Sequence, residues 1–218
     1  MTINNVVTQR QSTPRSTWSQ FLPGATIAQD LQTELIRKSL HMLIAVVPLI
    51  ANVVGAAGAL TILAAGTIFY TYAETLRKRG GSVFIVSRVT VLAARSRDDG
   101  FVLGPVTLGL GAMLALILYP APAASIAIYA LAFGDGLSSL AGKAFGSIRI
   151  PGTGGKTVEG SLVGFGAVFA VAIAVTGVPW IAFVIAAAAM VIELIPAADA
   201  DNIILPTFVG LIASQLPL

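Results

Sequence analysis

Four groups of polar residues, each inside or beside an apolar stretch, could carry chemistry in this chain. The first is "FGDGLSSLAGKAFG", where Asp135 follows an apolar run and Lys143 comes eight residues later, on roughly the same face of a helix. A carboxylate within a membrane helix is costly, and it is therefore usually paired or functional. The sequence leaves two interpretations open: an internal ion pair with a nearby Arg or Lys, or a site for a charged ligand.

The second group is "PGTGGKTVEGS", residues 151–161, in which glycines and threonines surround Lys156 and Glu159 just before an apolar segment. Exposed backbone N–H groups at the start of a helix are a natural phosphate site. The stretch is not a P-loop, because Ile150 occupies the position of the first glycine of that motif and no strand is expected before it. A flexible glycine turn is the structural alternative.

The third group is "ELIRKSLHM", residues 34–42, whose polar side chains share one helical face: Glu34, Arg37, Lys38 and His41. A salt-bridged helix start at a membrane border explains the two basic residues. It explains His41 less well, because the single histidine of the chain lies just inside the apolar run. A structural and a functional role for this face are equally open.

The fourth group is "IELIPAADADNIILP", residues 192–206, which offers hard oxygen ligands suited to Mg²⁺ at Glu193, Asp199, Asp201 and Asn202. Taken alone, such a loop is usually just solvated. Taken together, the four groups supply carboxylates for Mg²⁺, lysines and backbone amides for phosphates, and a carboxylate or His41 to accept a proton. Phosphoryl transfer requires mainly this charge neutralisation and alignment.

The elements that must position these residues are apolar helices. The chain has 218 residues, 56% of them hydrophobic and only 11% charged, with a mean hydropathy of +0.88. Soluble domains have about 25% charged residues. Segments long enough to cross a bilayer as helices are expected at 39–56, 58–75, 101–119, 123–142, 161–177, 179–196 and 202–217. The sequence thus predicts an all-α, polytopic integral membrane protein with about seven transmembrane helices. The absence of cysteine excludes disulfides and thiol nucleophiles.

The charges support this count, because with seven spans all of them fall on one side of the membrane. The positive-inside rule makes that side cytoplasmic and places the N-terminus there, in the cytoplasmic membrane. Any active site with charged groups then faces the cytoplasm. The net charge of +3 is explained by this distribution, and we expect no nucleic-acid partner. We expect a polar N-terminal tail over 1–33, with no signal peptide, and a single transmembrane catalytic domain over 34–218.

At this point the motifs resemble those of a known group. "FGDGLSSLAGKAFG", "GGKTVEGS" and "DADNIILP", with "ELIRKSLH" before them, look like the signature of the polyprenol (dolichol), phytol and CTP-dependent diacylglycerol kinases, a family distantly similar to CDP-diacylglycerol synthases. The resemblance covers about 34–217. It implies a membrane enzyme that phosphorylates a lipid alcohol, commonly with CTP and a divalent cation.

The leading hypothesis is therefore a lipid-alcohol kinase that uses a nucleoside triphosphate, with CTP as the expected donor, and Mg²⁺. The candidate catalytic residues are Asp135, Lys143, Lys156, Glu159 and His41. The candidate metal ligands are Asp135, Asp201 and Glu159. The candidate nucleotide-binding residues are Gly134, Gly142, Gly146, Gly152, Gly154, Gly155, Thr157, Ser161 and Asn202.

Two other functions compete with this hypothesis. A phosphatidate cytidylyltransferase would share CTP, Mg²⁺ and a lipid acceptor, but would attack a different phosphorus. A transporter is less consistent, because it predicts charges on both faces or along a path, and the opposite connections carry none. The expected partners are the triphosphate, a membrane lipid alcohol and the bilayer, and a homo-oligomer is compatible with the sequence.

Overall fold

The structure, a computed structural model, describes residues 23–81, 83, 86, 88, 90 and 100–218, and only the backbone of 23–30. These residues are almost entirely helical. The α-helices are α1 (Pro23–Met42), α2 (Val47–Lys78), α4 (Gly104–Leu118), α5 (Ala123–Tyr129), α6 (Gly136–Phe145), α7 (Val158–Thr176), α8 (Pro179–Glu193) and α9 (Asp201–Ser214). Shorter helical turns are η2 (Leu43–Val46), η3 (Ala130–Asp135) and η4 (Ala198–Ala200). The predicted all-α class is confirmed for the described residues.

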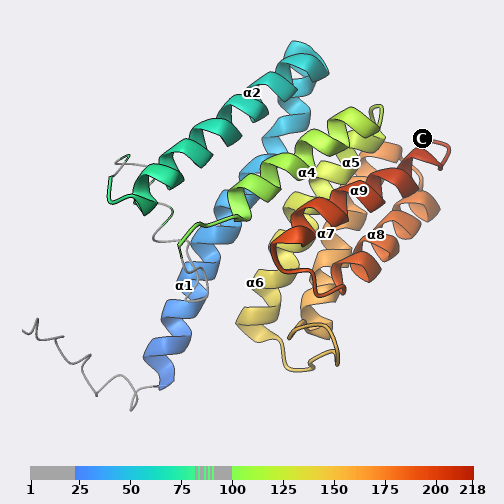
Figure 1. Cartoon of the computed structure of the whole chain (residues 1–218). Coiled ribbons are helices and arrows are strands. Elements are labelled where there is room, and N and C mark those ends of the chain that lie inside the picture. Colours follow the sequence, from blue (N-terminus) through green and yellow to red (C-terminus); the bar gives the residue numbers. More distant parts are fainter. Residues whose placement is uncertain (1–22, 82, 84–85, 87, 89, 91–99) are drawn as a thin grey trace, which may run out of the picture.

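Each of the seven predicted apolar segments is helical, and successive segments run in opposite directions (Figure 1). The first two are joined inside α2, where Gly55 has φ 78° and ψ 163° and the chain turns back. Glycine adopts this backbone conformation without the steric cost that a side chain would add. The predicted boundary between 39–56 and 58–75 therefore corresponds to a sharp reversal at a glycine.

Three helical stretches are long and apolar enough to cross a membrane: Leu31–Lys78, Ala123–Phe145 and Val158–Thr176. Two shorter apolar helices, Gly104–Leu118 and Pro179–Glu193, accompany them. Large apolar side chains on the outside, such as Val53 and Ile68, are 85% and 69% exposed. These helices are compatible with an integral membrane protein, in which lipid covers such side chains.

The helix boundaries follow from local chemistry. α7 begins after Thr157, whose Oγ1 accepts a hydrogen bond from the backbone N–H of Gly160 at 3.1 Å, and it ends at Gly177, which has φ 68°. α1 begins at Pro23, within the predicted polar tail, because no helix-breaking residue interrupts the chain between Thr26 and the end of α1. The first 22 residues of that tail lie outside the described residues.

Small residues allow the helices to approach closely. The main core lies between α5, α7, α8 and α9 and is built from alanines and branched aliphatic side chains, including Ile126, Leu131, Ile181 and Ile185. At the contact of α4 with α9, a Cβ atom on Gly111 would lie 1.9 Å from the Asn202 carbonyl oxygen. Pro206 has no N–H to donate to this oxygen. Gly111 therefore allows α4 to pack directly on backbone.

We expect Gly111→Ala to lower the free energy of unfolding by about 1–3 kcal/mol, because the added methyl meets backbone that cannot move aside. Thermal unfolding of the purified protein in detergent measures this. Gly166→Ala is the matched control, because its Cβ would meet nothing within 4 Å and alanine favours helix. Equal melting temperatures for the two variants would contradict the close packing of α4 on α9.

Candidate functional site

The polar face of α1 lies against α6, and its residues pair with the charged residues of "GDGLSSLAGK". The Lys38 ammonium forms an ion pair with Asp135 Oδ2, and both side chains are buried. His41 Nε2 donates a hydrogen bond to the Leu131 carbonyl oxygen at 3.0 Å and lies 3.4 Å from the same Asp135 oxygen. Of the two interpretations of Asp135, the internal ion pair is therefore present, with a partner from the first helix.

A second ion pair joins α1 and α6, one helical turn before Lys38 on α1. Lys143 Nζ lies 2.8 Å from Glu34 Oε2, and Glu34 also forms an ion pair with Arg37 one turn along α1. The order of the two pairs is that of antiparallel helices, because Glu34 meets the later residue Lys143 and Lys38 meets the earlier residue Asp135. Ser139 Oγ donates to Asp135 Oδ1 at 3.4 Å. The shared helical face that the sequence predicted is thus used for pairing α1 with α6.

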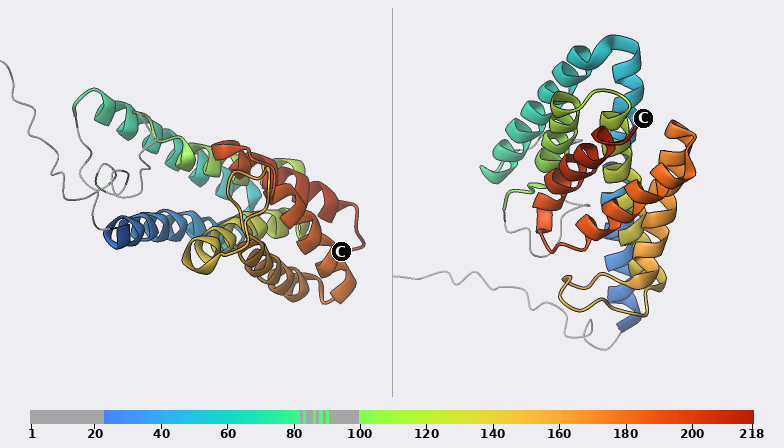
Figure 2. Two further views of the ribbon diagram at one scale, coloured as in Figure 1. Left: turned by 90° about the horizontal axis from the view of Figure 1, so that it is seen from below. Right: turned by 90° about the vertical axis from the view of Figure 1, so that its right-hand side faces the viewer.

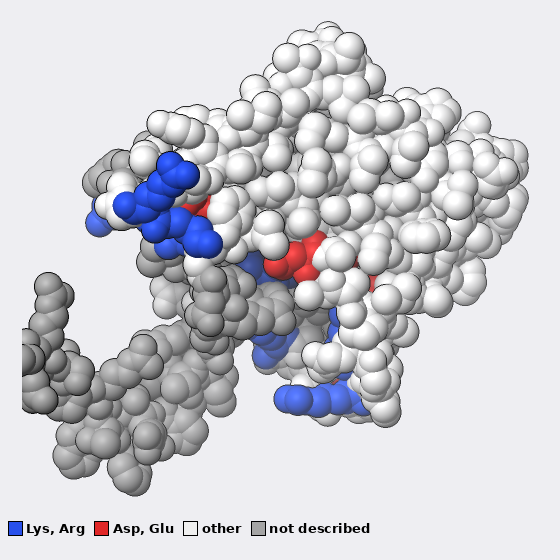
Figure 3. All heavy atoms as spheres, viewed as in Figure 1, with Lys and Arg blue, Asp and Glu red and all other residues white. Residues whose placement is uncertain are grey.

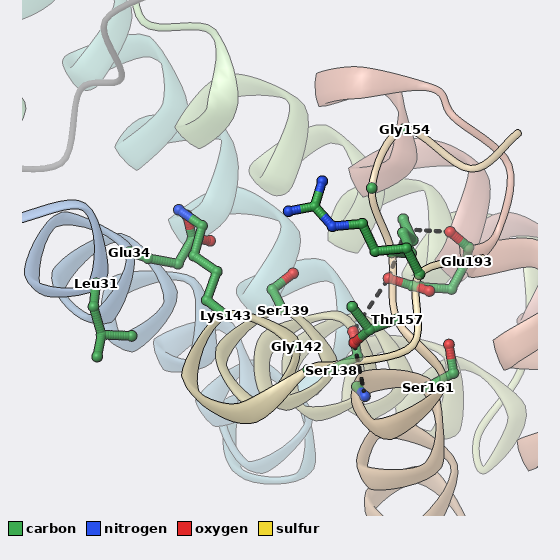
Figure 4. A pocket seen from close by; sticks show the side chains of 15 residues that line it. Leu31, Glu34, Ser138, Ser139, Gly142, Lys143, Gly154, Thr157, Ser161 and Glu193 are labelled. Carbon is green, nitrogen blue, oxygen red and sulfur yellow. Dashed lines mark hydrogen bonds and ion pairs between the residues drawn. The ribbon is translucent and has the colours of Figure 1, made fainter. Parts of the chain in front are cut away.

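A cleft of about 550 Å³ opens at this end of the helices, between α1, α6, the start of α7, the end of α8 and the loop before α7. Figure 4 shows Glu34 and Lys143 on one side of it and Glu193 on the other. Its lining comprises Leu31, Glu34, Ser138, Ser139, Gly142, Lys143, Gly146, Arg149, Gly154, Gly155, Lys156, Thr157, Gly160, Ser161 and Glu193. Three cations, two carboxylates and several hydroxyl groups therefore face one space.

The far wall of the cleft is held by Glu193 at the end of α8. Lys156 Nζ lies 2.5 Å from Glu193 Oε1 and also donates to the backbone carbonyl of Glu193. Ser138 Oγ donates to the same Oε1 at 3.1 Å. Glu193 Oε2 and Ser161 Oγ are buried and have no hydrogen-bond partner among the described residues. Two buried polar atoms beside the cleft thus have unused hydrogen-bonding capacity.

The loop before α7 is a glycine-rich turn closed by backbone hydrogen bonds. Ile150 N–H donates to the Lys156 carbonyl at 2.8 Å, and Val158 N–H donates to the Ile148 carbonyl at 2.9 Å. Three glycines of the loop have positive φ: Gly152 at 77°, Gly154 at 73° and Gly155 at 103°. Gly154 and Gly155 line the cleft, whereas Gly152 does not. The loop is therefore a defined turn that brings Lys156 over the cleft.

The Glu159 carboxylate is directed at this loop. Its Oε1 accepts hydrogen bonds from the backbone N–H groups of Ser147 at 3.0 Å and Ile148 at 3.1 Å. Glu159 is not among the residues that line the cleft. Its observed role is to fix the start of the loop to the first turn of α7.

We therefore expect Glu159→Gln to reduce the phosphoryl transfer predicted from the sequence by less than about tenfold, because a glutamine oxygen can still accept one of these amide hydrogens. Glu159→Ala removes the acceptor, and we expect it to lower the melting temperature as well. Steady-state transfer rates and thermal unfolding of both variants provide the measurement. Complete loss of transfer in a stably folded Glu159→Gln protein would instead support the predicted metal-binding role.

Three carboxylates line a small cavity beside the cleft, and of these only Glu193 also lines the cleft itself. The three are Asp135, Glu193 and Asp201, and the cavity has a volume of about 10 Å³. Burial raises the pKa of the Asp201 carboxyl, and the nearby negative charge of Asp135 raises it further. Within the part of the chain that the structure describes, no group of three or more Asp, Glu, His or Cys side chains is arranged to hold a metal ion by itself.

This donor set fits Mg²⁺ only as an ion that arrives with a nucleotide. Mg²⁺ typically takes one or two protein carboxylates and completes its coordination with water and substrate phosphates. Asp135 and Asp201 would supply those carboxylates, and Glu193 has an unpartnered oxygen beside them. The ion would neutralise charge on the phosphates. The predicted ligand Glu159 is held elsewhere, on the loop amides.

The remaining predicted residues divide between the cleft and helix packing. Gly142, Gly146, Thr157 and Ser161 line the cleft. A Cβ on Gly134 would lie 2.8 Å from a Val168 methyl carbon, so this glycine serves the contact of η3 with α7. The buried Asn202 side chain donates to Thr107 Oγ1 at 2.9 Å and thus joins α9 to α4. Neither Gly134 nor Asn202 lines the cleft.

Sequence reasoning did not assign several residues that the structure places at the site. Ser138, Ser139 and Arg149 line the cleft, as do Glu34 and Glu193, which had been noted only within their motifs. The serines follow Asp135 by one helical turn, a spacing that could have indicated a shared face. No signal in the sequence shows that Glu193, rather than Asp201, contacts Lys156.

Charged side chains gather at the end of the molecule that holds the cleft. In Figure 3 blue and red spheres lie at the left margin, at the centre and at the lower end of this face, and its upper and right-hand parts are white. No family model, curated protein or solved structure matches this chain. The functional argument therefore depends on the motifs and on the geometry of the cleft.

Proposed function

We propose that this protein is a membrane lipid-alcohol kinase that transfers the terminal phosphate of a nucleoside triphosphate, with CTP as the expected donor, to the hydroxyl of a polyprenol, a phytol-like alcohol or diacylglycerol. The seven helical segments would each cross or enter the membrane, with the N-terminus and the cleft on the cytoplasmic side. The observation that carries the proposal is one cleft at the charged end of apolar helices that is lined by Lys143, Arg149 and Lys156.

Each part of the cleft has a place in this reaction. The three cations and the Gly154 and Gly155 backbone bind and neutralise the phosphates, which is the main requirement of phosphoryl transfer. Asp135 and Asp201, which line the small cavity beside the cleft, would hold the Mg²⁺ that accompanies the nucleotide, and the ion would neutralise charge on the phosphates. Glu193 Oε2, which has no hydrogen-bond partner among the described residues, accepts the proton of the lipid hydroxyl. At the same time the oxygen of that hydroxyl bonds to the terminal phosphorus. The bond from that phosphorus to the bridging oxygen breaks, and the nucleoside diphosphate leaves.

Transfer of radiolabel from CTP tests this function. Purified protein in lipid nanodiscs is incubated with Mg²⁺ and a panel of lipid alcohols or phosphatidate, with CTP labelled at either the γ- or the α-phosphate. The proposal predicts that γ-label, and no α-label, reaches a lipid alcohol. Transfer of α-label to phosphatidate would show a cytidylyltransferase, and no transfer from CTP, ATP, GTP or UTP to any lipid would contradict both.

A further inference from the structure

Two ion pairs join α1 to α6 and η3, and each includes a side chain to which the proposed reaction gives a role, Lys143 or Asp135. α1 packs on α6 and η3, and Figure 2 shows it beside α6 at the margin of the helices. Its outer face carries Leu35 and Leu40, which are 46% and 37% exposed. Its inner face contributes Glu34 to Lys143 and Lys38 to Asp135. One of these pairs, Glu34 with Lys143, lies at the cleft, whereas Lys38 and Asp135 are buried behind it.

The two side chains of the Glu34–Lys143 pair differ in solvent exposure. The Glu34 side chain is 3% exposed and keeps Arg37 as a partner in its own helix. The Lys143 side chain is 46% exposed and reaches it from α6. A phosphate in the cleft carries more negative charge than a carboxylate and binds ammonium groups strongly. Lys143 can therefore exchange Glu34 for phosphate, whereas Glu34 stays with α1.

We propose that α1 is a gate on the cleft, which the nucleotide loosens by taking Lys143 from Glu34. This inference rests on the proposed function. Loss of the Glu34 pair frees the part of α1 that lines the cleft at Leu31 and Glu34, while the pair of Lys38 with Asp135 still holds the following turn. The seam between α1 and α6 then opens sideways, in the plane of the membrane, and gives the lipid hydroxyl a path to the cleft. Nucleotide binding would thus precede entry of the lipid.

Linkage makes the gate measurable in both directions. If nucleotide binding weakens the docking of α1, then weakening the docking must strengthen nucleotide binding by the same factor. We expect Glu34→Gln to bind Mg²⁺ and the non-hydrolysable analogue β,γ-methylene-CTP about fivefold more tightly than the wild type. Arg37→Gln is the matched control, because it also removes the pair within α1 but leaves Glu34 on Lys143. Asp199→Asn controls for a general change of charge at this end.

The movement of α1 away from α6 is measured with two spin labels. The chain has no cysteine, so Leu35→Cys on α1 and Phe145→Cys on α6 can be labelled specifically, and both side chains are exposed. The distance between the labels is measured by pulsed electron resonance in nanodiscs, with and without Mg²⁺ and the CTP analogue. We expect longer distances with the analogue, and longer distances in Glu34→Gln even without it.

The outcomes separate the gate from the function on which it rests. If the analogue binds and the label distances do not change, the gate is overturned and the proposed function stands. If the analogue does not bind to the wild type at all, both proposals fall. Weaker or unchanged binding in Glu34→Gln also overturns the gate, because linkage requires tighter binding.

Discussion

Asp135→Asn is expected to reduce phosphoryl transfer at least about a thousandfold, because the variant loses a negative charge needed at the phosphates' metal ion. The same change leaves the Lys38 ammonium buried without its counter-charge. Loss of one partner of a buried pair costs about 3–5 kcal/mol of stability. Transfer of γ-label from CTP and thermal unfolding in detergent measure the two effects.

A second variant separates these effects. Asp135→Asn combined with Lys38→Met removes both charges of the pair, and we expect it to recover most of the lost stability. Transfer should stay at the level of the single variant. If activity returned together with stability, Asp135 would serve only to pair α1 with η3, and its assignment to the reaction would be wrong.

Lys156→Met is expected to lower the rate of transfer by about 10²- to 10³-fold, the usual cost of removing one group that stabilises charge in a transition state. Lys156 is placed for this role by the glycine turn and by Glu193, whose Oε1 lies 2.5 Å from its Nζ. The rate is measured at saturating CTP.

Lys78→Met is the matched control, because Lys78 ends α2 and lies outside the cleft. Both changes remove one positive charge and leave an apolar side chain of similar length. Equal effects of the two variants would mean that only the general positive charge of this surface matters. The assignment of Lys156 to the phosphates would then fail.

Much of the fold could be predicted from the sequence, because apolar segments of sufficient length and their Gly and Pro boundaries determine where helices lie in such a chain. Gly55, for example, divides two apolar stretches at the place where the chain reverses. The start of α1 could not be placed so well. Hydropathy detects apolar residues, and the largely polar stretch from Thr26 to Thr33 continues the same helix without a glycine or proline.

The site was predictable in part. The helical face shared by Glu34, Lys38 and His41 follows from their spacing, but spacing does not indicate which helix that face meets. The partner is α6, about a hundred residues later in the chain, and the wide turn η3 precedes it directly. Such π-helical turns have no reliable sequence signal, although they often occur at functional sites.

Glu159 and Glu193 show the same limit for the carboxylates. Glu159 lies three residues after Lys156, and Glu193 lies in the same motif as Asp201. The sequence alone favoured Glu159 as the metal ligand. The loop amides of Ser147 and Ile148 hold Glu159, whereas Glu193 contacts Lys156 and Ser138 inside the cleft. Which carboxylate a lysine meets depends on helix packing that only the three-dimensional structure supplies.

The central claim is that the cleft between α6, α7 and α8 binds the phosphates of a nucleotide. Equilibrium binding of CTP with Mg²⁺ to purified protein in nanodiscs tests it directly, in the wild type and in Lys143→Met combined with Lys156→Met. The proposal predicts a dissociation constant for the wild type in the range of about 1 μM to 1 mM, and binding at least about a hundredfold weaker in the double variant. Equal affinity in the two proteins, or no binding to the wild type, would contradict it.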